Sequence, residues 1–164
     1  MVSLRAAAPA DFPAIARVVA AAFGDSRFDE AGIVAGVRVE GAALVDLVAE
    51  DAGEIVGHVL FSRMTCRPDR FIAALGPLAV APGRQRQGIG QALSRQGIEA
   101  CRELGAAASV LLGHPAYYPR FGFSTEAAQR LISPYAGSPA FMALELVPGA
   151  LAEPLTVAFP AAFG

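Results

Sequence analysis

The sequence contains no lysine and no tryptophan among its 164 residues, so each of its 13 formal cations is an arginine. A chain without lysine cannot form a Schiff base with a carbonyl substrate. It also lacks the Gly-Lys-Ser/Thr run of a P-loop nucleotide site. These absences remove two common ways in which a protein of this size binds or transforms a substrate.

The sequence also lacks an excess of either charge and a long hydrophobic run. The formal net charge is −2, which gives no electrostatic reason to expect nucleic acid or an anionic membrane as a partner. No apolar run is long enough to cross a bilayer, and residues 1–5 lack the pattern of a signal peptide. We therefore expect a cytoplasmic protein.

Cysteine and histidine are scarce as well. Cys66 and Cys101 lie far apart in the sequence, which favours two free buried thiols and again a cytoplasmic setting. The two histidines, His58 and His114, have no close spacing to the cysteines, so no metal site is expected. A Gly-x-Ser-x-Gly turn is absent, which removes the serine hydrolases of that type.

What the sequence does contain is the composition of a packed domain. It is 54% hydrophobic and 17% charged, which predicts one folded domain over residues 1–164. Apolar periodicity predicts helices at residues 11–24, 27–40 and 88–104, with Asp11 as the N-cap of the first. Strands are predicted at residues 2–6, 43–50, 54–64, 71–80, 107–112, 141–147 and 155–159, with one helical turn near residues 126–131. This order indicates a mixed α/β fold that begins with antiparallel strands and then adds one strand-helix-strand unit with a parallel pair.

A Gly-rich loop over residues 82–93 joins a predicted strand to a predicted helix, which is a geometry for binding anions. The first amides of a helix have no internal acceptor and carry partial positive charge. Gly88 and Gly90 let the backbone approach a ligand closely, while Arg84 and Arg86 add charge that suits phosphate. A dinucleotide fold fits poorly, because leucine stands where a third glycine is needed and the strand lies in mid-chain. The third interpretation is the pyrophosphate of an acyl-CoA.

Three stretches of the chain resemble motifs of the GNAT superfamily of N-acetyltransferases. Gln85-Arg86-Gln87-Gly88-Ile89-Gly90 resembles the Gln/Arg-x-x-Gly-x-Gly/Ala signature of that superfamily. Leu75 to Val80 resembles its bulged fourth strand, and Tyr118 to Phe123 resembles its Tyr-x-x-x-Gly-Phe motif. The longer run from Leu112 to Phe123 is similar to the YhbS-like predicted acetyltransferases. The resemblance is strongest over residues 75–123, and the order of elements extends it to nearly the whole chain.

The resemblance implies a GNAT-like fold, in which a mostly antiparallel twisted sheet is flanked by helices and one central parallel strand pair is splayed apart. It implies acetyl-CoA as the co-substrate and no metal. The amides from about Gln87 to Gln91 would hold the pyrophosphate, and the backbone of Leu78 and Val80 would pair with the pantetheine arm like an added strand. The expected CoA-binding residues are Leu78, Ala79, Val80, Arg84, Gln85, Arg86, Gln87, Gly88, Ile89, Gly90 and Gln91.

A proton donor for the leaving thiolate is expected in the aromatic motif. Tyrosine suits this chemistry because its reference pKa, about 10, is close to that of a thiol, about 8.5. The resemblance assigns the catalytic acid to Tyr118, four residues before Gly122. Tyr117 is adjacent, but only one of the two side chains can face the sulfur, and simple packing is the expectation for Tyr117. A strand amide near Val80 could stabilise the oxyanion.

The sequence offers no firm general base. By resemblance, Asp25, Asp29 and Glu30 lie in a region that lines the acceptor side, although solvated surface charge is the favoured interpretation of all three. His58 lies on a predicted strand and is expected to be a hydrogen-bonded core or surface residue rather than a cleft residue. His114 is expected to position the aromatic motif rather than to react.

Together these observations predict an acetyl-CoA-dependent N-acetyltransferase that transfers the acetyl group directly to a primary amine in a ternary complex. The amine could belong to a small molecule or to a protein. Two alternatives stay open. The same fold could use another acyl-CoA such as succinyl-CoA, with Arg120 as the partner of an acidic acyl group, or it could bind CoA as a sensor or interaction module without catalysis. By resemblance, a homodimer is slightly favoured.

Overall fold

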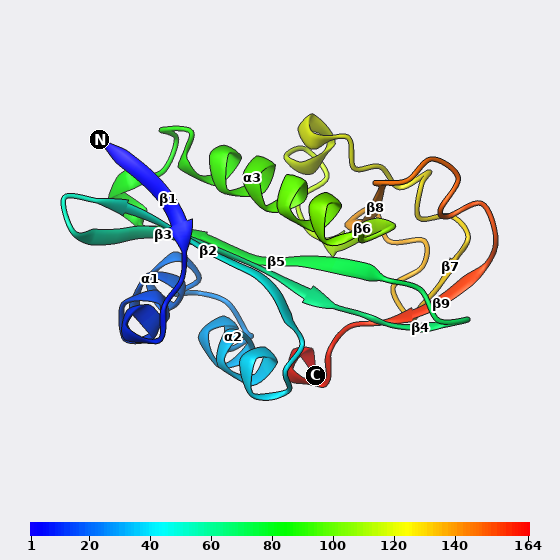
Figure 1. Cartoon of the computed structure of the whole chain (residues 1–164), viewed down its shortest axis with the longest axis horizontal. Coiled ribbons are helices and arrows are strands. Elements are labelled where there is room, and N and C mark those ends of the chain that lie inside the picture. Colours follow the sequence, from blue (N-terminus) through cyan, green and yellow to red (C-terminus); the bar gives the residue numbers. More distant parts are fainter.

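A computed structural model describes all 164 residues of the chain. Its centre is a twisted six-stranded sheet with helices on both faces (Figure 1). In spatial order the strands are β1 (Val2–Ala6), β2 (Ala43–Asp51), β3 (Glu54–Arg63), β5 (Ile72–Val80), β6 (Ala108–Leu112) and β8 (Phe141–Glu145). Helices α1 (Phe12–Ala22) and α2 (Glu30–Val39) lie on one face, and α3 (Ile89–Leu104) lies on the other (Figure 1).

The strand pairing confirms the predicted mixed sheet. Within the six-stranded sheet β5 and β6 pair in parallel, and the other neighbours pair antiparallel. Helix α3 connects β5 to β6, as a parallel pair requires a crossover. The predicted strand and helix bounds agree with the observed ones to within a few residues. The largest difference is α2, which begins at Glu30 rather than at residue 27.

The central parallel pair separates soon after it forms. Only Ile72 to Ala74 of β5 pair with β6, although β5 continues to Val80 along β3. The pairing ends just before Gly76-Pro77, where a proline nitrogen has no hydrogen to donate to a ladder. The β3–β5 register also shifts here, between Val59 and Phe61. The bulged strand and the splayed pair expected from the sequence are therefore both present.

Each face of the sheet has its own hydrophobic core. On the α3 side, Phe61 and Leu93 are fully buried with Phe123. Gly97 lets α3 approach the sheet closely, because a Cβ there would overlap the ring of Phe61. On the opposite side, α1 and α2 bury Ile15, Val19, Val34 and Val37 against β2, β3 and β5. The periodic apolar stripes of the helices thus predict which side of each helix faces the sheet.

Asp11 precedes α1 as predicted, but the expectation that it caps this helix is wrong. Its side chain makes no capping bond to α1. Instead the Ala8 amide donates to Oδ2 at 2.8 Å, and the Arg5 guanidinium donates to both carboxylate oxygens. A short 3-10 turn over Pro9–Asp11 places Asp11 in helical backbone geometry, so its carboxylate folds back toward the preceding turn instead of forward.

A second, three-stranded sheet was not predicted from the sequence. It consists of β4 (Thr65–Arg67), β9 (Leu155–Ala158) and β7 (Leu131–Ile132), in that order. Two of these strands have only two or three residues, which is too few for periodicity to show. The helical turn predicted near residues 126–131 is instead a series of turns that ends in β7. None of the helices combines the length and the hydropathy needed to cross a lipid bilayer.

Candidate active site

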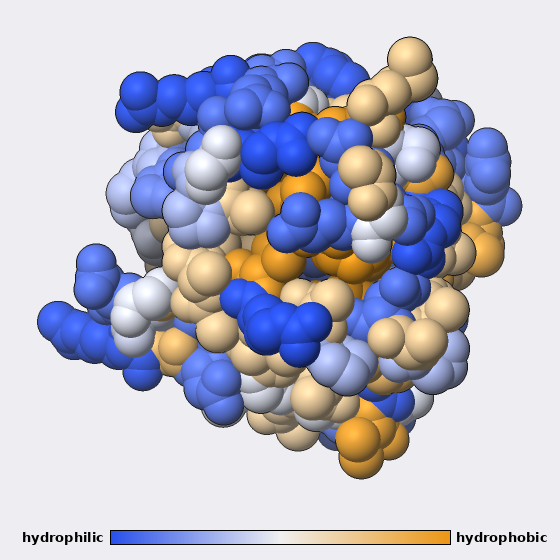
Figure 2. Space-filling model, turned by 90° about the vertical axis from the view of Figure 1, so that its left-hand side faces the viewer, coloured by the Kyte–Doolittle hydropathy of each residue, from blue (hydrophilic) through white to orange (hydrophobic).

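A cleft of about 920 Å³ opens where β5 and β6 diverge. The face of the molecule that carries the N-terminal end of α3 is hollowed, with hydrophobic residues in the hollow and hydrophilic ones around it (Figure 2). The cleft is lined by β5, the loop before α3, the turn after β6, the α1–α2 connection and the C-terminal segment. Its volume is in the range of small-molecule and cofactor sites.

The loop before α3 leaves its backbone amides open. The first internal bond of α3 runs from the Ala92 amide to the Gly88 carbonyl at 3.0 Å, so the amides of Ile89, Gly90 and Gln91 have no acceptor within the helix. Gly88 adopts a φ of +84°, a left-handed conformation that favours glycine. These three amides lie at the positive end of the α3 dipole, which suits an anion.

The polar side chains of the loop divide into bound and free groups. Arg84 donates from Nη2 to Asp51 Oδ2 at 2.8 Å and from Nε to Gln87 Oε1 at 3.2 Å. Gln85 Nε2 donates to the Val80 carbonyl at 3.2 Å. Arg86 is exposed and makes no hydrogen bond or ion pair. Arg84 and Gln85 therefore hold the loop in shape, and Arg86 is the arginine of this loop whose full charge faces solvent.

The edge of β5 that faces the gap is left without a strand partner. The Ala81 amide donates to the Val56 carbonyl of β3 at 2.9 Å, so Ala81 faces β3. Because successive residues of a strand turn their backbone groups to opposite sides, Val80 and Leu78 direct theirs into the cleft, where the Val80 carbonyl accepts from the Gln85 side chain. The backbone of Ala79 faces β3 instead, and its side chain is buried on the side of the sheet that α1 and α2 cover.

Most of the predicted CoA-binding residues lie together around this cleft. Those that line it are Leu78, Val80, Arg84, Gln85, Arg86, Gly88, Ile89, Gly90 and Gln91. Ala79 and Gln87 do not line it. The Ala79 side chain packs on the side of the sheet that α1 and α2 cover, and the Gln87 side chain accepts a hydrogen bond from Arg84. The residues that come from one continuous stretch of sequence thus form one wall of the cleft.

Tyr117 and Tyr118 both line the cleft, but they have different surroundings. Their rings meet edge to face with centroids 5.0 Å apart. The Tyr117 hydroxyl reaches the first turn of α3, where it lies 3.1 Å from the position that a Cβ on Gly90 would take. Burial raises the pKa of Tyr117, and nearby Arg120, Arg95 and Ser94 partly offset that rise. The buried Ser94 hydroxyl approaches without forming a hydrogen bond of normal geometry.

Tyr118 lies deeper than its neighbour. Its ring packs against Gly113, where a Cβ would overlap it, and against Phe121 and Phe123. Burial raises the pKa of Tyr118 to about 12, and Tyr117 adds to the rise. The phenol therefore keeps its proton at neutral pH and can act as a hydrogen-bond donor or an acid toward a group in the cleft.

Arg120 and His114 support the turn over residues 117–121 that carries both tyrosines, which we call the aromatic turn. Arg120 Nε donates to the Tyr117 carbonyl at 2.7 Å, and its guanidinium carbon lies 4.3 Å from the centre of the Tyr117 ring. The carbonyl of His114 accepts from the Tyr117 amide at 3.0 Å and the Tyr118 amide at 3.4 Å. His114 thus positions both tyrosines through its backbone. Arg120 thus contacts Tyr117 through one hydrogen bond and one cation–π contact.

The three carboxylates of the α1–α2 region have three different environments. Asp25 is exposed and does not line the cleft. Asp29 caps α2, because its Oδ1 accepts from the Gly32 amide at 2.9 Å. Glu30 is half-buried in the cleft wall, where its Oε2 accepts from the Ser26 hydroxyl at 2.6 Å. Solvated surface charge describes Asp25, but it does not describe Glu30.

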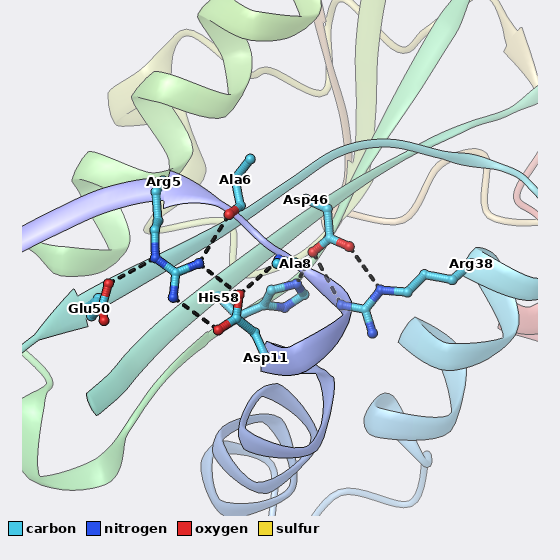
Figure 3. Close-up of polar contacts among 8 residues, drawn as sticks. All are labelled: Arg5, Ala6, Ala8, Asp11, Arg38, Asp46, Glu50 and His58. Atoms are coloured by element: carbon cyan, nitrogen blue, oxygen red, sulfur yellow. Dashed lines mark hydrogen bonds and ion pairs between the residues drawn. The ribbon is translucent and has the colours of Figure 1, made fainter. Parts of the chain in front are cut away.

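His58 belongs to a buried polar network rather than to the cleft (Figure 3). Its fully buried ring bonds through Nε2 to Asp46 Oδ1 at 2.7 Å, and Arg38 donates to both Asp46 oxygens at 2.8 and 3.2 Å. Arg38 also stacks over Phe12, 3.7 Å from the ring centre. Burial acts to raise the Asp46 pKa, but the hydrogen bonds from His58 and Arg38 outweigh it and hold that pKa below its usual value. This network joins α2 to β2 and β3.

An aromatic wall completes the cleft, and the sequence did not reveal it. Its members are Phe23 and Phe28 from the α1–α2 connection, Tyr135, and Phe159 and Phe163 from the C-terminal segment. The C-terminal segment is held against α2, because the amides of Ala161 and Ala162 donate to the Glu40 carboxylate. These aromatics are isolated in the sequence and follow no period, so no local pattern marks them.

No group of three or more His, Cys, Asp or Glu side chains is placed to hold a metal ion.

Sequence comparisons give similarities over most of the chain. The profile of the acetyltransferase (GNAT) family matches residues 13–123. The uncharacterized N-acetyltransferase YjhQ of Escherichia coli strain K12 is 36% identical over 149 residues, which cover 87% of this chain and 81% of that protein. The uncharacterized N-acetyltransferase YhbS of the same strain is 35% identical over 126 residues, which cover 76% of this chain and 74% of that protein.

Solved structures are similar over the full length. A GNAT family acetyltransferase from Brucella melitensis, in complex with acetyl-CoA, has a TM-score of 0.84 and 34% identity and covers 100% of this chain and 99% of its own. YhbS from Escherichia coli, in complex with CoA, has a TM-score of 0.88 and 32% identity and covers 99% of this chain and 91% of its own. Both similarities include β7, β8, β9 and the C-terminal segment, which lie beyond residue 123 and outside the family match.

Proposed function

The chain belongs to the acetyltransferase (GNAT) family, and we propose that it transfers the acetyl group of acetyl-CoA to a primary amine within a ternary complex. One observation supports this assignment above the others. The open amides of α3, the unpaired edge of β5 and two tyrosine side chains meet in a single cleft. A phosphate site, an extended-chain site and a proton donor are therefore in the order in which acetyl-CoA presents its pyrophosphate, pantetheine and thioester.

In the proposed complex the pyrophosphate lies on the amides of Ile89, Gly90 and Gln91, with Arg86 beside it. The pantetheine arm pairs with the backbone of Leu78 and Val80, because these residues face the gap between β5 and β6. Peptide-like amides of the arm can bond to an open strand edge as an added strand does. This arrangement directs the thioester toward the tyrosines that follow β6.

The reaction needs no covalent enzyme intermediate. The neutral amine attacks the thioester carbonyl, and the carbon–nitrogen bond forms as the carbonyl oxygen takes up negative charge. A β5 amide near Val80 would stabilise that oxyanion. As the carbon–sulfur bond breaks, Tyr118 passes its proton to the sulfur while negative charge is still developing there, and the amine nitrogen releases its proton to water at the open end of the cleft. Tyr118 is reprotonated from solvent, so one acetyl group and no net electrons are transferred.

Neither cysteine is suited to an acyl-enzyme route. Burial raises the pKa of Cys66 to about 11 and that of Cys101 to about 12, so both stay protonated and are poor nucleophiles at neutral pH. Neither residue lines the cleft. The two free thiols also fit the reducing cytoplasm, where we propose that the protein works.

The test is an assay of free thiol release from acetyl-CoA with a panel of primary amines, alongside calorimetric titration with CoA. Release with acetyl-CoA supports the proposal, whereas release with succinyl-CoA alone would indicate the other donor. Binding of CoA without release for any amine would indicate a sensor or interaction module. Arg86→Gln should weaken CoA binding by about fivefold at low salt and by less at high salt. Arg17→Gln is the matched control, because Arg17 is exposed and does not line the cleft.

A further inference from the structure

We propose that the acceptor is a primary amine carried on an apolar, preferably aromatic, body, which lies on the aromatic wall of the cleft with its ammonium group beside Glu30. This inference rests on the proposed acetyl transfer and names the substrate class of the same site. The wall consists of Phe23, Phe28, Tyr135, Phe159 and Phe163. The ammonium group binds beside Glu30 and releases one proton to water, and the resulting neutral amine then attacks the thioester.

The shape of the wall is fixed by contacts among its own members. Phe159 lies between two partners, with ring centroids 5.9 Å from Tyr135 and 5.3 Å from Phe163. Phe163 and Phe23 also pack, together with Ile33, against the core between the sheet and helices α1 and α2. Rings held by their neighbours form a preorganised apolar surface, which a ligand can cover with little loss of side-chain freedom.

Phe28 is the exception, because it is 68% exposed although it lines the cleft. Its ring therefore has apolar area to lose from water when a ligand arrives, and burial of such area is favourable. The exposed Phe28 lies two residues before the half-buried Glu30, which is the first residue of α2, so an amine bound against Phe28 can reach Glu30.

The charges of the cleft favour one ammonium group and disfavour other acceptors. The arginines that line it, Arg84, Arg86 and Arg120, belong to the loop before α3 and to the aromatic turn. At the aromatic wall the acidic lining residue is Glu30. A polycation would need several carboxylates there, and an acidic acceptor would meet Glu30 without a compensating cation.

The experiment compares amines that differ only in their apolar body, with saturating acetyl-CoA and thiol release as the readout. The ratio kcat/KM should rise by about fourfold for each methylene that the wall covers. For 2-phenylethylamine it should exceed that of ethylamine by about 10- to 150-fold, the value expected for burying an aromatic side chain. Spermidine, with several charges and no ring, should be a poorer substrate than 2-phenylethylamine.

Two variants test the two halves of the site. Phe28→Ala should reduce the preference for 2-phenylethylamine over ethylamine by about tenfold. Its control is Val147→Ala, since Val147 is 51% exposed and outside the cleft. Glu30→Gln should raise KM for 2-phenylethylamine by about three- to tenfold while kcat changes little. Its control is Glu126→Gln, at an exposed residue outside the cleft.

The outcomes separate this inference from the proposed function. Thiol release that is equal for ethylamine and 2-phenylethylamine, or greatest for spermidine, overturns the substrate class and leaves the acetyltransferase activity standing. CoA binding with no release for any amine overturns the activity itself and the inference with it. A dimer that Phe28→Ala abolishes, with the amine preference unchanged, would assign Phe28 to a subunit interface and also overturn the inference.

Discussion

Exchange of each tyrosine for phenylalanine should separate proton donation from cofactor binding. Tyr118 lies in the core of the aromatic turn, and burial raises its pKa to about 12. Complete transfer of its proton to a thiolate with a pKa of about 8.5 would be uphill by about 5 kcal/mol. Tyr118 therefore acts on the thiolate while charge is still developing, so its loss is felt in the transition state and little in the ground state.

We expect Tyr118→Phe to lower kcat by about two orders of magnitude, or about 2.7 kcal/mol of transition-state stabilisation, with the acetyl-CoA affinity nearly unchanged. Tyr117→Phe should instead weaken CoA binding and leave kcat nearly unchanged. Its hydroxyl lies at Gly90, in the turn proposed to hold the pyrophosphate, so its loss should weaken CoA binding by about three- to tenfold, as loss of one hydrogen bond does. Steady-state kinetics with thiol release and calorimetry with CoA measure the two quantities separately.

The pH dependence gives an independent check. An acid must be protonated to work, and a raised pKa keeps Tyr118 protonated to higher pH. Activity should therefore show no alkaline loss due to Tyr118 below pH 10. If kcat is unchanged in Tyr118→Phe but falls by about a hundredfold in Tyr117→Phe, the proton comes from Tyr117 and the assignment is refuted.

Two further predictions concern stability. Gly97→Ala would place a methyl group on the ring of Phe61, and such overpacking should lower the free energy of unfolding by about 1–3 kcal/mol in urea denaturation. Asp46→Asn removes the carboxylate that His58 and Arg38 share and should cost about 2–3 kcal/mol at pH 7. Because the folded pKa of Asp46 is lowered, this carboxylate stabilises the fold above the unfolded value of about 4. The difference between wild type and Asp46→Asn should therefore shrink as the pH falls through the folded pKa.

Both stability predictions have matched controls. Gly83→Ala is the control for the first, because a Cβ at Gly83 would meet no atom within 4 Å. Asp69→Asn is the control for the second, since Asp69 is exposed and forms no ion pair. If Gly97→Ala is as stable as Gly83→Ala, α3 can move away from the sheet at no cost. A difference for Asp46→Asn that is constant from pH 7 to pH 2 would show that the charge of Asp46 does not stabilise the fold.

The sequence predicts those parts of the structure that are local in the chain. The strand, loop and helix over residues 71–104 carry their own signals: an apolar run, a Gly-Pro bulge, a Gly-rich turn and a helical stripe. The same locality makes the loop before α3 predictable, because the geometry that opens its amides follows from Gly88 and the start of the helix. In contrast, β7 and β4 have two and three residues, and they become strands only because β9 lies between them.

Asp11 and Glu30 show why a residue type at a plausible position is not enough. Both are acids near a helix start, and the sequence predicts a helix cap for Asp11 and a solvated surface charge for Glu30. Arg5 reaches Asp11 from β1, a separate element, and takes the carboxylate away from the helix that it was expected to cap. Glu30 lies in the first turn of α2, which the fold places against the cleft. In each case the outcome depends on a tertiary contact that local spacing does not contain.

The acceptor side of the cleft is the extreme case of this dependence. Its wall draws on the end of α1, the connection to α2, the segment after β7 and the C-terminal residues. These segments meet because the Glu40 carboxylate accepts the amides of Ala161 and Ala162 and so holds the C-terminal segment against α2. Acceptor choice can therefore change through single residues at distant positions, while the CoA side depends on one short loop. A chain of this architecture can keep its acetyl donor and change its amine, so the wall and Glu30 carry the information about substrate that the Gly-rich loop does not.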